Sequence, residues 1–271
     1  MFAKYQISIE TVQGLLDRRK PLKDRSVIGN NKKVITESLK RAFTPIDGVI
    51  NGDSLKQNFF PTETKKVFNV FISHSHDDVD IAEKFAKWLE SNFLVSCFVD
   101  SMVWKNMADL QMLVDRNLPK NEKGRYRYTD VLKSSAHVHS MLSLSLFEMI
   151  DQCECCIFIG SKNSLRLNLH EINNETLSPW IYQEIFYMNH AKPITPQHVE
   201  DLLKNPSITK ACESQINDAA ISHSVNLQDF ITLVPRHFSF DSRIEMNDGE
   251  AFLELLYLKT KVLNYNDIIY G

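Results

Sequence analysis

The sequence predicts an α/β protein built around a parallel sheet with helices on both faces. Three short apolar runs, rich in β-branched and aromatic residues, alternate with longer stretches of helical period. This alternation is typical of parallel sheets, because each strand returns to the sheet through a crossover helix. The 271 residues are 43% hydrophobic and 24% charged, which is the balance of a globular protein large enough to bury a core.

The three runs are expected to be buried strands over residues 67–72, 94–99 and 155–159. After the first run, Ile81, Phe85, Trp88 and Leu89 recur at helical spacing. A second helix is expected over 139–152. A third begins where Ser178 precedes Pro179, the favoured cap and first-turn pair, and ends before Pro193.

Three regions are expected along the chain. Residues 1–64 form an N-terminal extension with a short helix over 32–42, and residues 65–195 form the core. Residues 196–271 form a C-terminal, α-rich extension that completes the sheet and packs on the core. It is expected to contribute a strand over 231–234 and a closing helix over 250–263.

Composition excludes several classes of protein. Lys and Arg number 31 against 34 Asp and Glu, so no basic excess indicates a nucleic-acid partner. No apolar run approaches the roughly 20 residues that span a bilayer, and no secretory signal begins the sequence, so a cytoplasmic protein without membrane contact is expected. The five cysteines lack the spacing of a disulfide framework. No metal site is expected, because His74 and His76 alone are weak evidence for metal binding.

Polar residues gather where the predicted strands end. Ligands of open α/β sheets bind outside the carboxyl ends of the strands, which here are residues 73–78, 100–104 and 160–163. On the helix that begins at Ser178, Trp180, Glu184 and Tyr187 share a face. Most helical Glu side chains are simply exposed, so spacing alone does not single out Glu184. Glycine-rich phosphate loops are absent, so any nucleotide must be bound in another way.

Three segments, in the right order, resemble the boxes of TIR (Toll/interleukin-1 receptor) domains. Residues 67–78, VFNVFISHSHDD, resemble the first box, and residues 98–101, FVDS, resemble the strand that enters the BB loop. Residues 178–184, SPWIYQE, are similar to the S-x-W-x-x-x-E segment, whose Glu is catalytic in NAD-cleaving members. The resemblance covers residues 67–192. The chain departs from the family in lacking a Pro-Gly element after Asp100 and in its long insert over 117–139.

The resemblance implies a flavodoxin-like TIR fold and an NAD+ nucleosidase of the glycohydrolase or cyclase type. The chain looks most like stand-alone prokaryotic TIR proteins, including the second-messenger generators of Thoeris-type antiviral defence. In that case Glu184 is catalytic, NAD is a substrate rather than a cofactor, and the product is an ADP-ribose-derived signal sensed by a downstream effector. Self-association into an oligomer through TIR contacts is implied as well.

Six further residues are candidates for substrate binding. Ser73, His74, Ser75 and Asp100 could hold ribose and phosphate oxygens, although capping and turn formation explain them equally well. Trp104 or Trp180 could stack on nicotinamide or adenine, and packing in the core is the alternative.

Other functions remain open from the sequence. The first is a non-catalytic TIR module that assembles with partner TIR domains, because fold does not fix function. A phospho-receiver would need an Asp at the end of the third strand, where Ile159, Gly160 and Ser161 stand instead. A nucleoside-sugar transferase also uses a Glu in a similar sheet.

Overall fold

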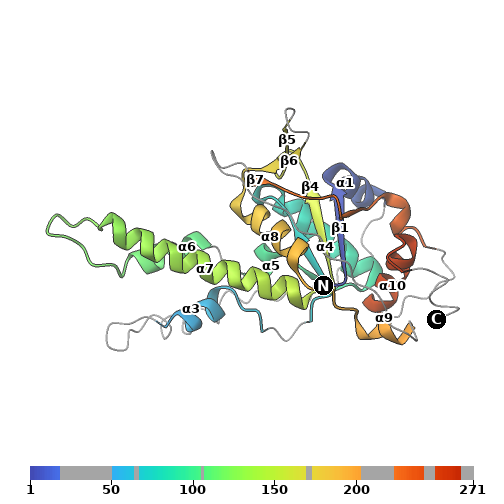
Figure 1. Ribbon diagram of the computed structural model, residues 1–271, viewed down its shortest axis with the longest axis horizontal. Helices are drawn as coiled ribbons and strands as arrows, with labels where there is room; N and C mark the ends of the chain where they lie inside the picture. Colours follow the sequence, from blue (N-terminus) through green and yellow to red (C-terminus); the bar gives the residue numbers. More distant parts are fainter. Residues whose placement is uncertain are drawn as a thin grey trace. The chain divides into compact units, whose positions relative to one another are not determined.

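The computed structural model describes residues 1–18, 51–63, 67–104, 107–168, 173–202, 223–240 and 248–263 (Figure 1). The expected helix over 32–42 lies outside these ranges. The chain divides into two compact units, each discontinuous in sequence. Unit 1 comprises Met1–Arg25, Val67–Val99 and Ile150–Gly271, and unit 2 comprises Ser26–Lys66 and Asp100–Met149.

Unit 1 is built on a five-stranded sheet in which every neighbouring pair is parallel. This confirms the predicted α/β class with a central parallel sheet, and the architecture is consistent with a flavodoxin-like fold. In spatial order the strands are β3 (Cys97–Phe98), β2 (Val70–Ser73), β4 (Cys155–Gly160), β1 (Ala3–Ser8) and β8 (Ile231–Thr232).

The strand β1 lies in the interior of the sheet, between β4 and β8, so the N-terminal residues are not an extension outside the core. The expected boundary at residue 65 misses this strand because β1 alternates buried and half-buried residues instead of forming an apolar run. Its polar side chains find partners at the sheet surface. Lys4 donates to Asn189 over 2.7 Å, and Gln6 donates to Thr232 over 3.1 Å.

The units also differ from the expected domains in the middle of the chain. Residues 100–149, expected within the core, belong to unit 2. Residues beyond 196 share unit 1 with the sheet, to which they supply the edge strand β8. The other expected strands and helices of the core are present within a few residues of their expected bounds, except that the helix expected over 139–152 begins eleven residues earlier, at Tyr128.

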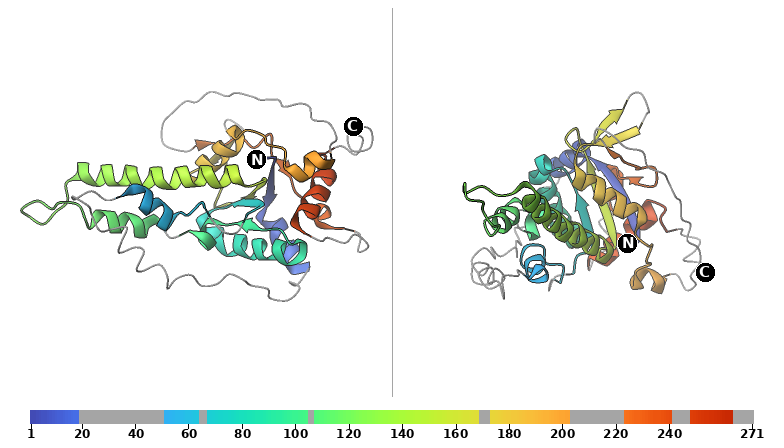
Figure 2. Two further views of the ribbon diagram at one scale, coloured as in Figure 1. Left: turned by 90° about the horizontal axis from the view of Figure 1, so that it is seen from below. Right: turned by 60° about the vertical axis from the view of Figure 1, so that its left-hand side comes forward.

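Helices cover both faces of the sheet, as Figure 2 shows in its left view. The crossovers from β1 and from β2 run toward the β3 edge, and their helices α1 (Ile9–Arg18) and α4 (Val79–Phe93) contact each other on one face. The connection from β4 to β8 runs the other way and places α8 (Pro179–His190) on the opposite face.

An aromatic cluster joins the C-terminal elements to α4. Phe93 stacks on Phe252 of α10 (Gly249–Lys259) with 4.3 Å between ring centroids, and Phe238 of the 3₁₀ turn η2 (Pro235–Phe238) packs edge-on against Trp88. The first residue of α10, Gly249, lies so close to the chain at Leu94 that a Cβ there would come within 2.8 Å of its carbonyl oxygen. The remaining described elements of unit 1 are the 3₁₀ turn η1 (His76–Asp78), α9 (Gln197–Leu202) and a small antiparallel sheet of β5 (Arg166–Asn168), β6 (Asn173–Thr176) and β7 (His223–Ser224).

The described residues of unit 2 form helices joined by turns, with one isolated antiparallel bridge between Lys120 and Tyr126. Polar contacts tie its helices together: Glu148 accepts from Lys56 over 2.5 Å and from Thr62 over 2.7 Å. The helices are α3 (Gly52–Phe59), α5 (Asp100–Val103), α6 (Met107–Asp115) and α7 (Tyr128–Gln152), the last of which ends in unit 1. Among the helices of both units that the structure describes, none combines the length and apolar character needed to cross a bilayer.

Candidate active site

The hydroxyl of Ser73 and the carboxylate of Glu184 meet at the carboxyl ends of the strands. Ser73 is the last residue of β2, and its Oγ donates to Oε2 of Glu184 over 2.5 Å. Both side chains are buried, with exposed fractions of 1% for Ser73 and 6% for Glu184. A strand end and a helix therefore hold one carboxylate at the edge where ligands of α/β sheets bind.

The local sequence explains why α8 presents Glu184 there. Ser178 caps the helix by accepting from the backbone N–H of Ile181 over 3.3 Å, and Pro179 occupies the first turn. Ile181, Ile185 and Met188 then form a buried stripe that fixes the rotation of α8 on the sheet. Glu184 was expected on the face of Trp180 and Tyr187, beside this stripe. The structure places it among the buried residues of the helix, while Trp180 and Tyr187 are half-buried.

A second polar cluster joins the loops that follow β2 and β4. The buried carboxylate of Asp78 accepts from Oγ of Ser161, and its Oδ1 accepts from Nδ2 of Asn163 over 2.7 Å. The sequence pointed to both loops as strand ends but gave no sign that Asp78 links them. The link fixes the two loops against each other at the edge that carries Ser73 and Glu184.

Two of the expected binding residues follow Ser73 directly. Ser75 is buried and precedes the turn η1. His74 is half-buried, and its Nδ1 lies 3.4 Å from the backbone carbonyl of Ile72. The structure keeps His74 and Ser75 on the same loop as Ser73, and their binding of ribose or phosphate stays a prediction.

Asp100 and Trp104 lie in unit 2, at the two ends of the short segment that contains α5. The carboxylate of Asp100 accepts from the backbone N–H of Ser101 over 2.7 Å, which is a helix-start contact. The indole N–H of Trp104 donates to the carbonyl of Pro61 over 3.1 Å, and its ring packs edge-on against Phe60. These contacts agree with the alternative functions of the two residues, which are turn or cap formation for Asp100 and packing for Trp104. Binding of a ligand by either residue stays a prediction.

The four described cysteines are buried. Burial raises the pKa of Cys153 to about 12 and holds the pKa values of Cys155 and Cys156 well above the ordinary range, so these thiols stay protonated and unreactive. Cys212 lies outside the described residues. In the described parts of the chain, no three His, Cys, Asp or Glu side chains converge as metal ligands would.

Comparison of the chain with protein-family models, with curated proteins and with solved structures found no match. The functional interpretation therefore depends on the sequence boxes and on the geometry around Glu184.

Proposed function

We propose that the protein is a TIR-type NAD-cleaving enzyme that releases nicotinamide and makes an ADP-ribose-derived signal, cyclic or conjugated forms included. The observation that carries the proposal is the buried pair of Ser73 and Glu184 at the carboxyl ends of the strands. A carboxylate held by a strand and a helix has the fixed position that stabilisation of a developing charge requires.

The chemistry needs one carboxylate and no acid. When the bond between the ribose C1′ and the nicotinamide nitrogen breaks, the electron pair goes to the nitrogen and neutralises the pyridinium. The ribose becomes an oxocarbenium-like cation, as in glycoside hydrolysis. Glu184 stabilises this cation, and water or another nucleophile then bonds to C1′ and loses its proton. Trp180, His74 and Ser75 are proposed to contact the substrate.

The exposure of Glu184 bears on how the enzyme is switched on. With 6% of the residue exposed, NAD reaches the carboxylate only when neighbouring segments move aside. We propose that assembly through TIR contacts causes this movement, so that the enzyme is inactive when dispersed and releases its cytoplasmic defence signal only when assembled.

The decisive experiment is incubation of the pure protein with NAD, dispersed and assembled, followed by detection of free nicotinamide. Glu184→Gln is expected to lower the rate by about 10²–10³, the usual effect of losing one preorganised electrostatic contact. Glu200→Gln, which alters an exposed carboxylate of α9, is the matched control and should retain full activity. Circular dichroism should be the same for all three proteins, and mass spectrometry of the product would identify the signal.

Two outcomes would favour other functions. No nicotinamide release from either dispersed or assembled protein would favour the non-catalytic TIR module. Release of a base from deoxynucleosides, without release from NAD, would favour the nucleoside-sugar transferase.

A further inference from the structure

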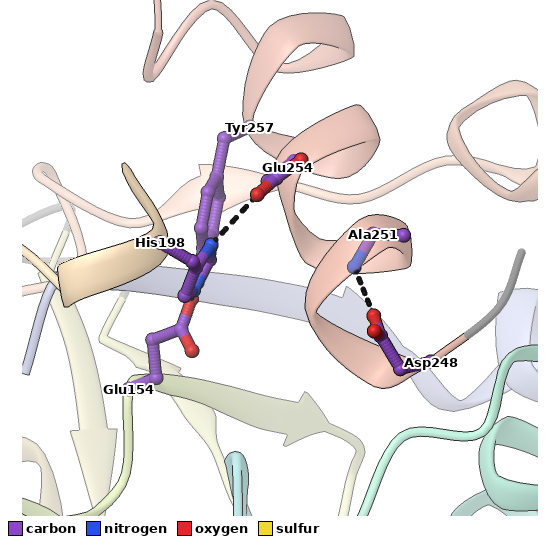
Figure 3. A network of polar contacts seen from close by, with 6 residues as sticks. All are labelled: Glu154, His198, Asp248, Ala251, Glu254 and Tyr257. Carbon is purple, nitrogen blue, oxygen red and sulfur yellow. Dashed lines mark hydrogen bonds and ion pairs between the residues drawn. The ribbon is translucent and has the colours of Figure 1, made fainter. Parts of the chain in front are cut away.

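A half-buried polar network lies at the amino end of β4, whereas Glu184 lies at the carboxyl ends of the strands. Its centre is His198 on α9, which lies between Glu154 and Glu254 and beside Tyr257 (Figure 3). Glu154 directly precedes β4, whereas Glu254 and Tyr257 belong to α10. The network therefore connects α9 to both the sheet and the C-terminal helix.

Both ring nitrogens of His198 face carboxylate oxygens at hydrogen-bond distance. Nε2 lies 3.0 Å from Oε1 of Glu154, and Nδ1 lies 3.0 Å from Oε1 of Glu254. A carboxylate can only accept, so both bonds form only when both nitrogens carry a proton. The neutral imidazole has one N–H, and its other nitrogen would turn a lone pair toward a negative oxygen. The arrangement is thus built for the imidazolium.

Glu154 is fixed in the position that this pairing needs. Its backbone N–H donates to the carbonyl of Asn69 over 2.9 Å, and its side-chain Oε1 also accepts from the hydroxyl of Tyr257 over 2.5 Å. Two donors on one oxygen fit an ionised carboxylate. The side chains of His198 and Glu154 are 14% and 11% exposed, so solvent screens their charges little.

The surrounding charges favour the protonated form of His198. Burial by itself would lower the pKa of His198, but the hydrogen bonds to Glu154 and Glu254 and the charges of Glu154 and Glu250 outweigh it and raise the pKa. Burial raises the pKa of Glu154, and this effect outweighs the hydrogen bonds from Tyr257 and His198, which lower it. Glu154, His198 and Glu250 also line a cavity of about 430 Å³, and the other residues with ionisable groups that line it are Met1, Asp151, Cys153 and Asp201.

We infer that His198 is a proton-dependent clamp, which holds α9 on the sheet and on α10 as an imidazolium and releases α9 when it loses its proton. The release is local because α9 has six residues and buries only Val199, whereas α10 is held by Phe252, Leu253, Leu256 and Tyr257. The direction of the pH dependence follows from the raised pKa of His198. The clamp is complete below the ordinary histidine pKa and is lost as the pH rises through the higher folded value.

Hydrogen exchange of the full chain tests the release, after correction for the intrinsic rate at each pH. Between about pH 6 and about pH 8.5, amides of α9 should lose protection by roughly tenfold, the effect of losing one hydrogen bond to a charged group, while α10 stays protected. His198→Gln should leave α9 equally unprotected at both pH values. His190→Gln, which alters an exposed histidine on α8, should behave as the unaltered protein.

Nitrogen NMR of the histidine rings tests the protonation state without any substitution. At neutral pH, His198 should show two protonated nitrogens, and its titration should centre above the ordinary value of about 6.5. Glu254→Gln should lower that midpoint and keep the bond to Glu154. A singly protonated His198 at neutral pH, or an α9 whose protection depends on pH as strongly in His198→Gln as in the unaltered protein, would overturn the inference. Neither measurement involves NAD, so the clamp and the proposed function fail or stand separately.

Discussion

Ser73 and Glu184 are 111 positions apart in the sequence, yet the hydroxyl of the first donates to the carboxylate of the second over 2.5 Å in the interior of unit 1. Ser73 was expected to touch the substrate. With 1% of its surface exposed, it is better placed to position the carboxylate that is proposed to do so.

Ser73→Ala should therefore lower kcat for nicotinamide release with little effect on KM, because the altered residue orients Glu184 and does not bind the substrate. Loss of one hydrogen bond to a charged group corresponds to roughly a tenfold effect or more. Steady-state kinetics on the active, assembled protein would measure this split.

The matched control for that variant is Ser145→Ala. Ser145 is a buried serine of α7 whose hydroxyl, among the buried polar atoms that the structure describes, has no hydrogen-bond partner. Its removal should leave kcat unchanged. Equal loss of activity in both variants would contradict the positioning role of Ser73.

Asp78→Ala should destabilise the folded protein, because it leaves Ser161 and Asn163 without their common acceptor at the ends of β2 and β4. The expected cost is about 1–3 kcal/mol in the free energy of unfolding, measured by chemical denaturation. Asp77→Ala alters the exposed neighbour and should change that free energy by less than about 0.5 kcal/mol. A similar cost in both variants would show that the loop contact contributes nothing specific.

Two glycines should respond in opposite ways to the same substitution. Gly249→Ala would place a Cβ 2.8 Å from the carbonyl oxygen of Leu94 and 3.1 Å from Cα of Val95, both backbone atoms that cannot turn aside. We expect a loss of about 1–3 kcal/mol in stability from this overpacking. Gly14→Ala, in α1 where nothing beyond the adjacent residues and the local helix backbone lies within 4 Å of the added Cβ, should stabilise by about 0.5–1 kcal/mol. Thermal unfolding of the two variants measures both, and destabilisation by both would contradict the packing argument.

In unit 2, acid should weaken the contact of α3 with α7. Burial favours the neutral form of Glu148, but hydrogen bonds from Lys56 and Thr62 and the charge of Lys56 outweigh this and lower the pKa of Glu148. A lowered folded pKa contributes stability above the unfolded value and loses it as the pH falls through the folded one. Glu148→Gln should therefore flatten the decline in stability below about pH 4.5. An unchanged acid profile in denaturation experiments would show that the decline has another source.

Local patterns were enough to predict much of the fold. The apolar runs at 67–72 and 155–159 are strands of the central sheet, and the Ser178–Pro179 start of α8 is a cap that acts within four residues. Such features depend on near neighbours in the sequence, and they place Glu184 on its helix correctly.

Contacts between distant segments could not be predicted. β1 carries Lys4 and Gln6, whose partners Asn189 and Thr232 lie more than 180 residues away, so its alternating pattern did not indicate an interior strand. For the same reason, no local signal indicated that Ser73 would face Glu184 or that His198 would join Glu154 to Glu254.

The interior position of β1 has a consequence for how the molecule is made. The strand β1 pairs with β4, about 150 residues later in the chain, and with β8, more than 220 residues later. Loop closure over such distances is slow, and the sheet can be completed only after Ile231 and Thr232 have been synthesised. Removal of residues 1–8 would thus separate the edge strand β8 from β4 and the rest of the sheet.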